Sequence, residues 1–206
     1  MNDALVPTIT IYRKALSFLI PLVNKEWDVI SVAKSPKEKK TLVEHLIHST
    51  KDNTAKYPEF DKQFYKFPCY LRRAVISEAI GIVSSYNSNY KNWLENGSKG
   101  KCPKLQTEHF ATPVFYKGNC YETTKNPNVV MLKLFHNNDW VWKPVKLRAT
   151  DIKYIQKTQS GKIKKAPLLE KRGKYYYLRF AFEEKIQLNK AEIESQIIVA
   201  VDLGLN

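Results

Sequence analysis

The sequence of 206 residues has few cysteines, and their spacing does not suit cysteine chemistry. There are three of them, Cys69, Cys102 and Cys120, with no Cys-x-x-Cys pair. A disulfide framework needs paired cysteines, and a zinc site needs cysteine or histidine ligands at short, regular spacings. The four histidines lie at no such spacing from the cysteines. We therefore expect neither a disulfide-stapled fold nor a zinc ion in this chain.

Membrane-targeting features are also scarce. The chain has no basic-then-apolar leader at its start and no apolar run near the ~18 residues of a spanning helix. It has neither a basic amphipathic helix nor a lipidation motif, which a membrane surface would require. We expect a cytoplasmic, reduced protein with no membrane partner.

Acidic residues are few, above all in the middle of the chain. The formal net charge is +14, and residues 98–180 alone hold eighteen Lys and Arg against five Asp and Glu. A basic excess concentrated in one segment favours a polyanion over a small-molecule substrate as partner. The hydrophobic fraction of 43% and the aromatic fraction of 12% are large enough for a packed core, which excludes bulk disorder.

The first hundred residues have helical patterns. Apolar residues recur with a period near 3.6 from Tyr12 to Ile30, and Pro21 should kink or split that helix. Ser35-Pro36-Lys37-Glu38 predicts a capped helix start, with the helix running to about His48. The polar stretch 49–66 reads as a loop.

The strongest helix pattern follows Pro68. One apolar stripe continues to Leu94, and Gly97 stands where a C-terminal cap belongs. We interpret the whole stripe as core. Gly81 inside this helix costs ~1 kcal/mol relative to alanine, which a close packing contact would explain.

Beyond a basic link at 96–101, the pattern changes to strands and turns. Segments 129–135 and 140–148 flank Asn137-Asn138-Asp139, and segments 163–170 and 174–183 flank Lys171-Arg172-Gly173. Both are hairpin signals. Pro144 indicates an edge strand or a bulge. We expect a small antiparallel barrel or sandwich, so the fold class is α+β.

Strand 174–183 alternates between two faces, with Tyr176 and Leu178 on one face and Tyr175 and Tyr177 on the other. The expected outer side of these strands mixes cations with aromatic residues, among them Tyr175 and Tyr177. Cations neutralise phosphates, and aromatic faces stack on unpaired bases. In contrast, we expect Trp140 and Trp142 to pack against other residues of the protein and not to stack on bases. The candidate nucleic-acid-binding residues are Arg72, Arg73, Lys99, Lys101, Lys104, Lys146, Arg148, Lys153, Lys164, Lys165, Arg172, Lys174, Tyr175 and Tyr177.

The chain closes with a different kind of strand. Residues 197–201 are wholly apolar, which is typical of a strand buried on both faces, and Asp202 and Gly204 follow. An aspartate at the end of such a strand needs a partner or a metal ion. Metal-dependent nucleases use aspartates in this way, with Mg²⁺ as a suitable ion. An actin-like ATPase loop and a chemically inert turn are the alternatives.

Three segments together resemble the TnpB (OrfB-type) family of transposon-encoded RNA-guided nucleases. They are Tyr70–Ala79, Tyr90–Trp93 and Val199–Asn206. The resemblance implies a helical recognition segment at 1–97, a basic β wedge at 98–190 and the start of a ribonuclease H-like RuvC domain at 191–206. It also implies a guide RNA and a target DNA as partners, with Asp202 as the first catalytic, Mg²⁺-binding carboxylate.

Family members need further carboxylates and a zinc ribbon beyond the last residue of this sequence. One carboxylate cannot hold two Mg²⁺ ions, so we expect the chain to bind nucleic acid without cutting it, and its standing as an enzyme stays open. A stand-alone nucleic-acid-binding module without nuclease activity is the main alternative.

Overall fold

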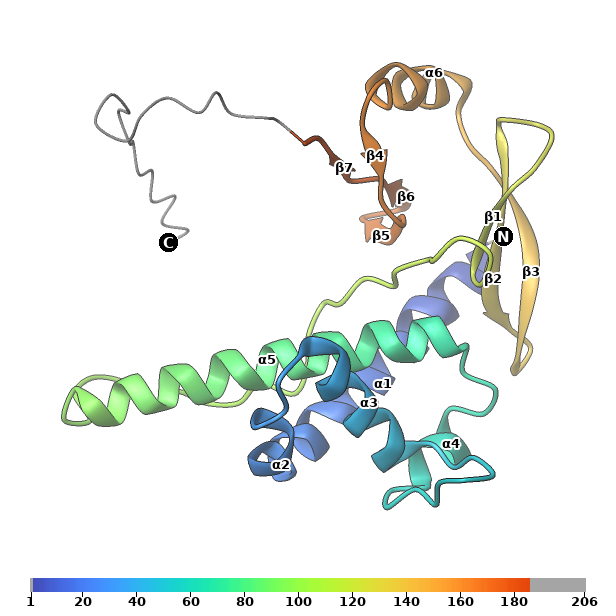
Figure 1. The fold of residues 1–206 in the computed structure, drawn as a ribbon. Helices are drawn as coiled ribbons and strands as arrows, with labels where there is room; N and C mark the ends of the chain where they lie inside the picture. The colour runs from blue at the N-terminus through green and yellow to red at the C-terminus, as the bar shows by residue number, and fades with distance from the viewer. Residues whose placement is uncertain (1, 186–206) are drawn as a thin grey trace, which may run out of the picture.

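The computed structural model describes residues 2–185, which begin with helices and continue as short strands with one further helix (Figure 1). The helices are α1 (Asn2–Lys25), α2 (Trp27–Ser31), α3 (Pro36–Ile47), α4 (Glu59–Gln63), α5 (Cys69–Glu95) and α6 (Ala149–Thr158). The strands are β1 (Tyr121–Thr123), β2 (Val129–His136), β3 (Asp139–Lys146), β4 (Ile163–Lys164), β5 (Leu168–Arg172), β6 (Tyr175–Arg179) and β7 (Phe182–Glu183). The fold class is α+β, as the sequence predicts.

Helix α1 continues through two prolines, Pro7 and Pro21. It begins well before Tyr12, and the chain divides at Glu26 rather than at Pro21. Proline inside a helix costs ~3 kcal/mol, but each fully buried large aliphatic side chain contributes ~1.5–3 kcal/mol. The fully buried neighbours of Pro21 are Leu19, Ile20 and Val23. Their burial outweighs the cost of the proline and keeps the helix intact.

Among the described residues, α1 is also the one helix that is long and apolar enough, by length and composition, to cross a membrane. The sequence predicts no apolar run of that length, and Arg13 and Lys14 do interrupt the apolar residues of this helix. Half of the most apolar stretch of α1 is buried inside the protein, against α5 and the sheet that contains β2. A core helix has the same composition. The absence of a membrane partner stays a prediction.

The expected cap of α3 is confirmed, because the Ser35 hydroxyl accepts a hydrogen bond from the Glu38 amide at 3.2 Å. The expected loop at 49–66 is wrong in part, since α4 lies within it. The polar composition of this stretch gives no sign of the helix, whose two phenylalanine rings pack on each other and meet a third ring edge to face. These rings are Phe60, Phe64 and Phe67.

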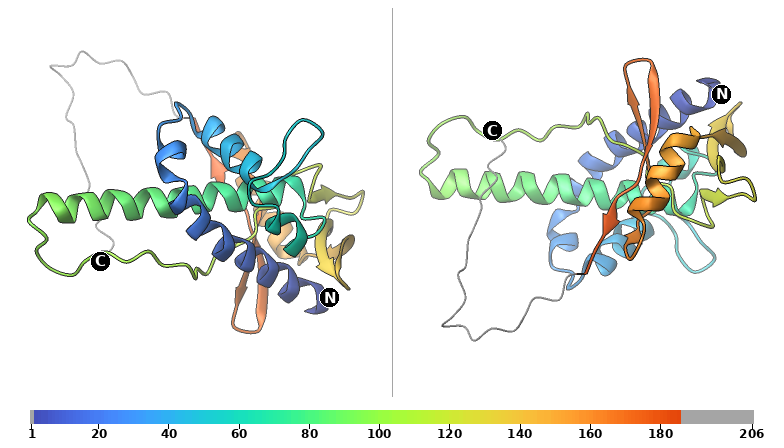
Figure 2. Two further views of the ribbon diagram at one scale, coloured as in Figure 1. Left: turned by 90° about the horizontal axis from the view of Figure 1, so that it is seen from below. Right: turned by 90° about the horizontal axis from the view of Figure 1, so that it is seen from above.

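Helix α5 begins and ends where the sequence predicts. At its C-terminus, the Ser98 amide donates to Trp93 O and the Gly97 amide to Leu94 O, with Gly97 at φ +69°. This is the double hydrogen bond of a glycine-capped helix end. The core stripe is shorter than expected, because burial stops at Val83 and Leu94 is 49% exposed. The end of α5 projects beyond the other helices (Figure 2).

No close contact explains Gly81. A Cβ atom at this position would meet nothing within 4 Å, so the packing explanation is wrong. The residue lines an open groove between α5 and the coil that follows it.

The first expected hairpin is confirmed as β2–β3, with β1 added on the other side of β2. Asn137 and Asn138 have φ of +49° and +58°, as a type I′ hairpin turn requires. Pro144 lies in β3, which is an edge strand, so its missing amide leaves no ladder bond unmade.

The second expected hairpin is present as β5–β6, but the strands within residues 2–185 form three separate sheets rather than a barrel. Two structural reasons account for this. The chain after β3 forms α6, where the sequence predicts no helix. In addition, the start of β5 is hydrogen-bonded to the coil that precedes β1. The Phe115 amide donates to Pro167 O, and the Leu169 amide donates to Pro113 O.

The helical and strand-rich parts share one hydrophobic core. Helix α1 packs against both α5 and β2, and the buried cluster runs from Ala4 to Leu169 without a break at the boundary expected at residue 97. The buried Thr8 hydroxyl accepts a hydrogen bond from the Phe135 amide of β2 at 2.8 Å. Residues 191–206, where a RuvC strand is expected, lie outside the described residues.

Candidate nucleic-acid interface

Helix α6 and strand β6 enclose an open cleft of about 490 Å³, which we call the α6–β6 cleft. Lys146 and Arg148 line it at the end of β3 and the start of α6, and Tyr175 and Tyr177 line it from β6. Its walls are completed by apolar side chains of α6, of β6 and of the residue that follows β6: Ile152, Ile155, Leu178 and Phe180. The cleft therefore combines exposed cations, aromatic faces and an apolar floor.

The alternation of side chains along β6 determines which of its tyrosine rings are exposed and free to contact a ligand. Tyr176 and Leu178 are half-buried toward the core, whereas Tyr175 and Tyr177 are 59% and 41% exposed. This is the alternation that the sequence predicts for the strand. The Lys174 ammonium lies 5.5 Å from the centre of the Tyr175 ring, so a cation and a stacking surface are adjacent.

One carboxylate organises the outer face of the β5–β6 hairpin. Glu170 accepts from Arg172 Nε at 2.9 Å and from Arg179 Nη1 at 3.0 Å. These hydrogen bonds, that of Arg172 first, hold the pKa of Glu170 below its usual range. Both guanidiniums remain more than half exposed and keep further N–H groups for an external acceptor.

Arg148 and Lys165 also have acidic neighbours. Arg148 Nε lies 2.9 Å from Asp151 Oδ2, and this hydrogen bond raises the pKa of Arg148. Its side chain is 77% exposed. Lys165 pairs with Glu183 of β7. Exposed pairs of this kind are worth ~0–1 kcal/mol, so a phosphate can displace the carboxylate.

Lys164 has a different environment. It is half-buried, with its ammonium 5.0 Å from the Phe180 ring centre. Burial, and then the nearby charge of Lys117, lowers its pKa. Among the part of the chain that the structure describes, Lys146, Lys153, Lys164 and Lys174 make no salt bridge.

The two helical candidates on α5 belong to an ion-pair cluster rather than to the cleft. Arg72 is 8% exposed and donates to Glu44 Oε1 through Nη2 at 2.9 Å and Nε at 3.2 Å. Arg73 donates to Glu44 Oε2 at 3.1 Å and is half exposed. Because Arg72 is buried and already paired, it has no free face for a phosphate, and we leave it out of the interface.

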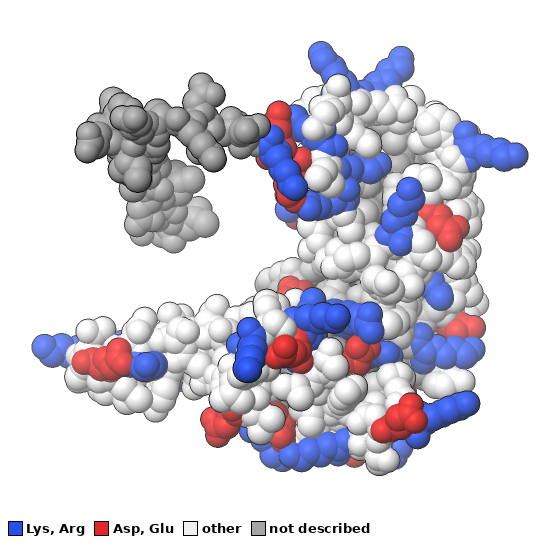
Figure 3. Space-filling view, viewed as in Figure 1, with Lys and Arg blue, Asp and Glu red and all other residues white. Residues whose placement is uncertain are grey.

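The remaining candidates are scattered. Lys99, Lys101 and Lys104 lie exposed on the coil after α5, and Lys153 lies on α6 rather than on a strand. Trp140 is buried, as expected of a packing residue, whereas Trp142 is 37% exposed. Around the strands and α6, more Lys and Arg than Asp and Glu are visible, although acidic side chains lie beside the cations of the strands; on the helical part both signs are interspersed (Figure 3).

Metal chemistry has no support among residues 2–185, where no group of three or more His, Cys, Asp or Glu side chains could hold an ion. Asp202, the expected catalytic and Mg²⁺-binding residue, lies outside the described residues. Burial raises the pKa of the Cys120 thiol to about 11, so it stays protonated at neutral pH.

The α6 wall of the cleft is the part that sequence reasoning missed. Ile152 and Ile155 stand three residues apart on one helical face, with Arg148 and Asp151 bonded across the first turn. That i,i+3 spacing is the signal that could have revealed it.

The fold and this surface define a basic α+β protein with a cation- and tyrosine-lined cleft. The chain belongs to the Aq_aa04 family, whose model matches residues 1–136. It is similar to the uncharacterized protein aq_aa04 of Aquifex aeolicus (strain VF5), with 30% identity over 106 residues. That match covers 48% of this chain and 61% of the relative, so the chain spans less than two thirds of the relative's length. No solved structure matches the chain.

Proposed function

We propose that this chain binds single-stranded nucleic acid, RNA in particular, through the α6–β6 cleft. The observation that carries the proposal is the placement of Tyr175 and Tyr177, exposed on β6, beside Lys146 and Arg148 in one open cleft. Unpaired bases stack on aromatic faces, and their phosphates need cations within a few ångströms. A duplex offers no free base faces, so the cleft suits an unpaired strand.

The finer proposal is that the chain is the N-terminal part of a transposon-associated, RNA-guided DNA nuclease. It rests on the TnpB resemblance of segments 70–94 and 197–206. In this proposal the cleft and the basic hairpin β5–β6 hold a guide RNA, target DNA pairs with that RNA, and Asp202 supplies the first Mg²⁺ ligand. The alternative function is a stand-alone RNA-binding module, which uses the same cleft and does not need Asp202 as a metal ligand.

Fluorescence anisotropy of the 206-residue chain with an unstructured 20-nucleotide RNA, from 50 to 300 mM salt, tests the binding proposal. Each phosphate contact contributes a slope of about −0.7 in log K against log salt for a single strand. Lys146→Gln and Arg148→Gln, which both change cations that line the cleft, should therefore each flatten the slope by about 0.7. Replacing Tyr175 and Tyr177 together by Ser should weaken binding about 10-fold or more with the slope unchanged, because stacking is not electrostatic.

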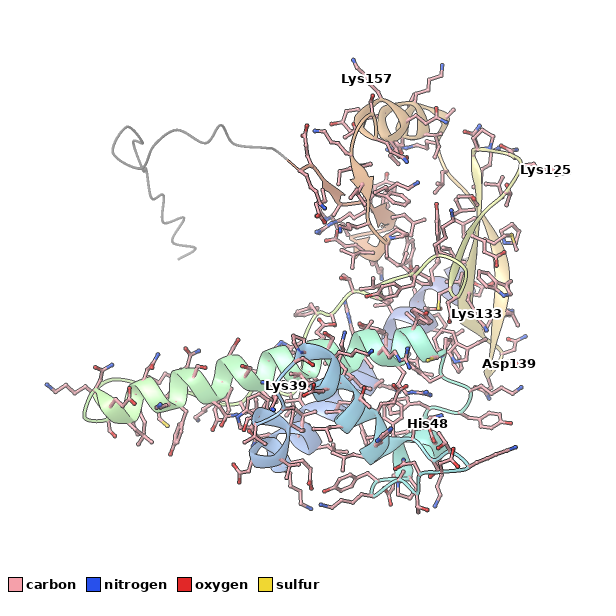
Figure 4. All side chains as sticks on the ribbon, in the orientation of Figure 1. Lys39, His48, Lys125, Lys133, Asp139 and Lys157 are labelled. Atoms are coloured by element: carbon pink, nitrogen blue, oxygen red, sulfur yellow. The ribbon has the colours of Figure 1, made fainter. Side chains whose placement is uncertain are left out.

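Two matched variants on α6 serve as controls. Tyr154 is 71% exposed and does not line the cleft, so Tyr154→Ser should bind as the wild type does. Lys157 points into solvent away from the cleft (Figure 4), so Lys157→Gln should leave the slope unchanged. Equal losses in the control and cleft variants, or no RNA binding by the wild type, would contradict the proposal.

The nuclease proposal has its own test. RNA that copurifies with the chain from its native cell should consist mainly of one structured species, because a guide RNA is a defined transcript. A broad mixture of cellular RNAs would instead favour the stand-alone binding module.

A further inference from the structure

A second groove lies on the helical part, between α1 and the coil that follows α5. It has a volume of about 910 Å³, and its lining includes Arg13 and Lys14 of α1, Gln63 of α4, and Gln106 and Phe110 of the coil. Its size is within the ~300–1,000 Å³ range of small-ligand sites, so a nucleotide fits. None of these residues is among the candidates that the sequence suggests.

Phe110 is the most unusual residue of this groove, which we call the Phe110 groove. Its side chain is 91% exposed, although the residue beside it, Ala111, is buried. An exposed phenyl ring on an anchored backbone gains nothing from folding, because its apolar area stays in water. It does, however, present a complete aromatic face to a ligand.

Arg13 supplies a cation at a fixed position beside that ring. Its Nε donates to Ala111 O at 3.0 Å, and its guanidinium carbon lies 5.3 Å from the Phe110 ring centre. One N–H is thus used to orient the group, and the other donors of the guanidinium remain for a phosphate. Within the described part of the chain, neither Arg13 nor its exposed neighbour Lys14 makes a salt bridge.

The rest of the lining is polar and suited to hydrogen bonding with a nucleotide. Side-chain amides of Gln63 and Gln106 and the hydroxyls of Thr10 and Ser17 can each donate and accept. Such groups read the edges of unpaired bases and the ribose 2′-hydroxyl. One carboxylate, Glu108, also lines the groove and opposes a phosphate there.

We propose that the Phe110 groove is a second nucleic-acid contact, in which an unpaired RNA base stacks on Phe110 while Arg13 and Lys14 hold its phosphates. This inference rests on the proposed RNA binding and adds a contact that is far in sequence from the α6–β6 cleft. Every residue named for the groove lies within residues 1–136, the region that the family model matches, whereas the lining of the cleft begins at Lys146.

A substitution series at Phe110 tests the stacking. Phe110→Trp keeps an aromatic face, whereas Phe110→Leu keeps apolar area without a π-face; at 91% exposure neither change disturbs the core. In anisotropy titrations with the same 20-nucleotide RNA, Phe110→Leu should weaken binding about 5- to 100-fold at an unchanged salt slope. Phe110→Trp should bind as tightly as the wild type or more tightly.

Charge variants and a DNA arm complete the experiment. Arg13→Gln with Lys14→Gln should flatten the salt slope by about 1.4, and Glu108→Gln should strengthen binding. A DNA oligonucleotide of the same sequence should bind the wild type more weakly than the RNA does, because DNA lacks the 2′-hydroxyl that the polar lining of the groove can hydrogen-bond.

The outcomes separate this inference from the proposed function. If Phe110→Leu binds RNA as tightly as the wild type while the tyrosine variant of the cleft still binds weakly, the Phe110 groove is not an RNA contact. The proposal for the α6–β6 cleft is then unaffected. Equal affinities of the wild type for the RNA and the DNA oligonucleotide overturn the assignment to RNA. Failure of the wild type to bind any RNA overturns both proposals.

Discussion

At the scale of single residues, the Glu44 cluster shows how burial assigns different roles to adjacent arginines. Burial raises the pKa of the Glu44 carboxyl, but hydrogen bonds from Arg72 and Arg73 outweigh it and leave the pKa below its usual range. Arg72 is enclosed, with 9% of its side chain exposed, while 52% of Arg73 faces water. The same carboxylate therefore makes one buried and one exposed ion pair.

We predict that Arg72→Ala lowers the free energy of unfolding by about 3 kcal/mol, because it leaves Glu44 buried with a weaker partner. The adjacent Arg73→Ala is the control and should cost at most about 1 kcal/mol, since an exposed pair contributes little. Urea unfolding at pH 7 measures both. Equal costs for the two variants would refute this account of the cluster.

The same cluster predicts a dependence on pH. The folded pKa of Glu44 is depressed, so its ion pairs stabilise the protein above the unfolded pKa and are lost as pH falls through the folded value. The difference in stability between wild type and Arg72→Ala should therefore narrow as the pH is lowered below the usual glutamate range.

At the scale of elements, the contact between α1 and β2 depends on one hydroxyl. Thr8 is fully buried, donates to Ala4 O at 2.6 Å and accepts from the Phe135 amide at 2.8 Å. The amide of a strand residue is therefore satisfied by a hydroxyl from a helix, and not by a carbonyl group of another strand. Periodicity in either element gives no indication of this bond.

Thr8→Val keeps the volume of the side chain but removes the acceptor, which leaves the Phe135 amide without its partner. We expect a loss of about 1–3 kcal/mol in the free energy of unfolding. Thr10→Val is the matched control, since Thr10 is exposed on the same helix and should cost almost nothing. A small loss for Thr8→Val, equal to that of Thr10→Val, would mean that water replaces the hydroxyl.

At the scale of the whole molecule, one core joins the helical and strand-rich parts. Because α1 packs on both α5 and β2, neither part keeps its buried surface when the other unfolds. The projecting end of α5 is the exception, since no residue beyond Val83 in this helix is buried.

We therefore predict a single cooperative unfolding transition for both parts. Far-UV circular dichroism, which reports mainly the helices, should have the same urea midpoint as hydrogen exchange of the β2 amides. Amides near the end of α5 should exchange faster than the global transition allows, because they open locally. Two separated transitions would show that the boundary at residue 97 divides independent units.

Features that depend on local chemistry could be predicted from the sequence. Ser35 and Glu38 predicted the start of α3, Gly97 the end of α5, and Asn137-Asn138 a turn with positive φ. Alternation in β6 also predicted which of its tyrosines face outward. Each of these depends on residues within a few positions of one another, so the local pattern is sufficient.

Which of the candidate cations lie together depends on the packing of the whole chain and could not be predicted from local patterns. The sequence makes both Arg72 and Lys146 candidate nucleic-acid-binding cations. In the structure, however, Arg72 is buried against Glu44 and does not reach the surface. The α6–β6 cleft formed because α6 follows β3, and the Phe110 groove formed because the coil after α5 returns to α1. Such contacts join residues far apart in sequence, and the free energy of burial that selects them is a property of the whole core.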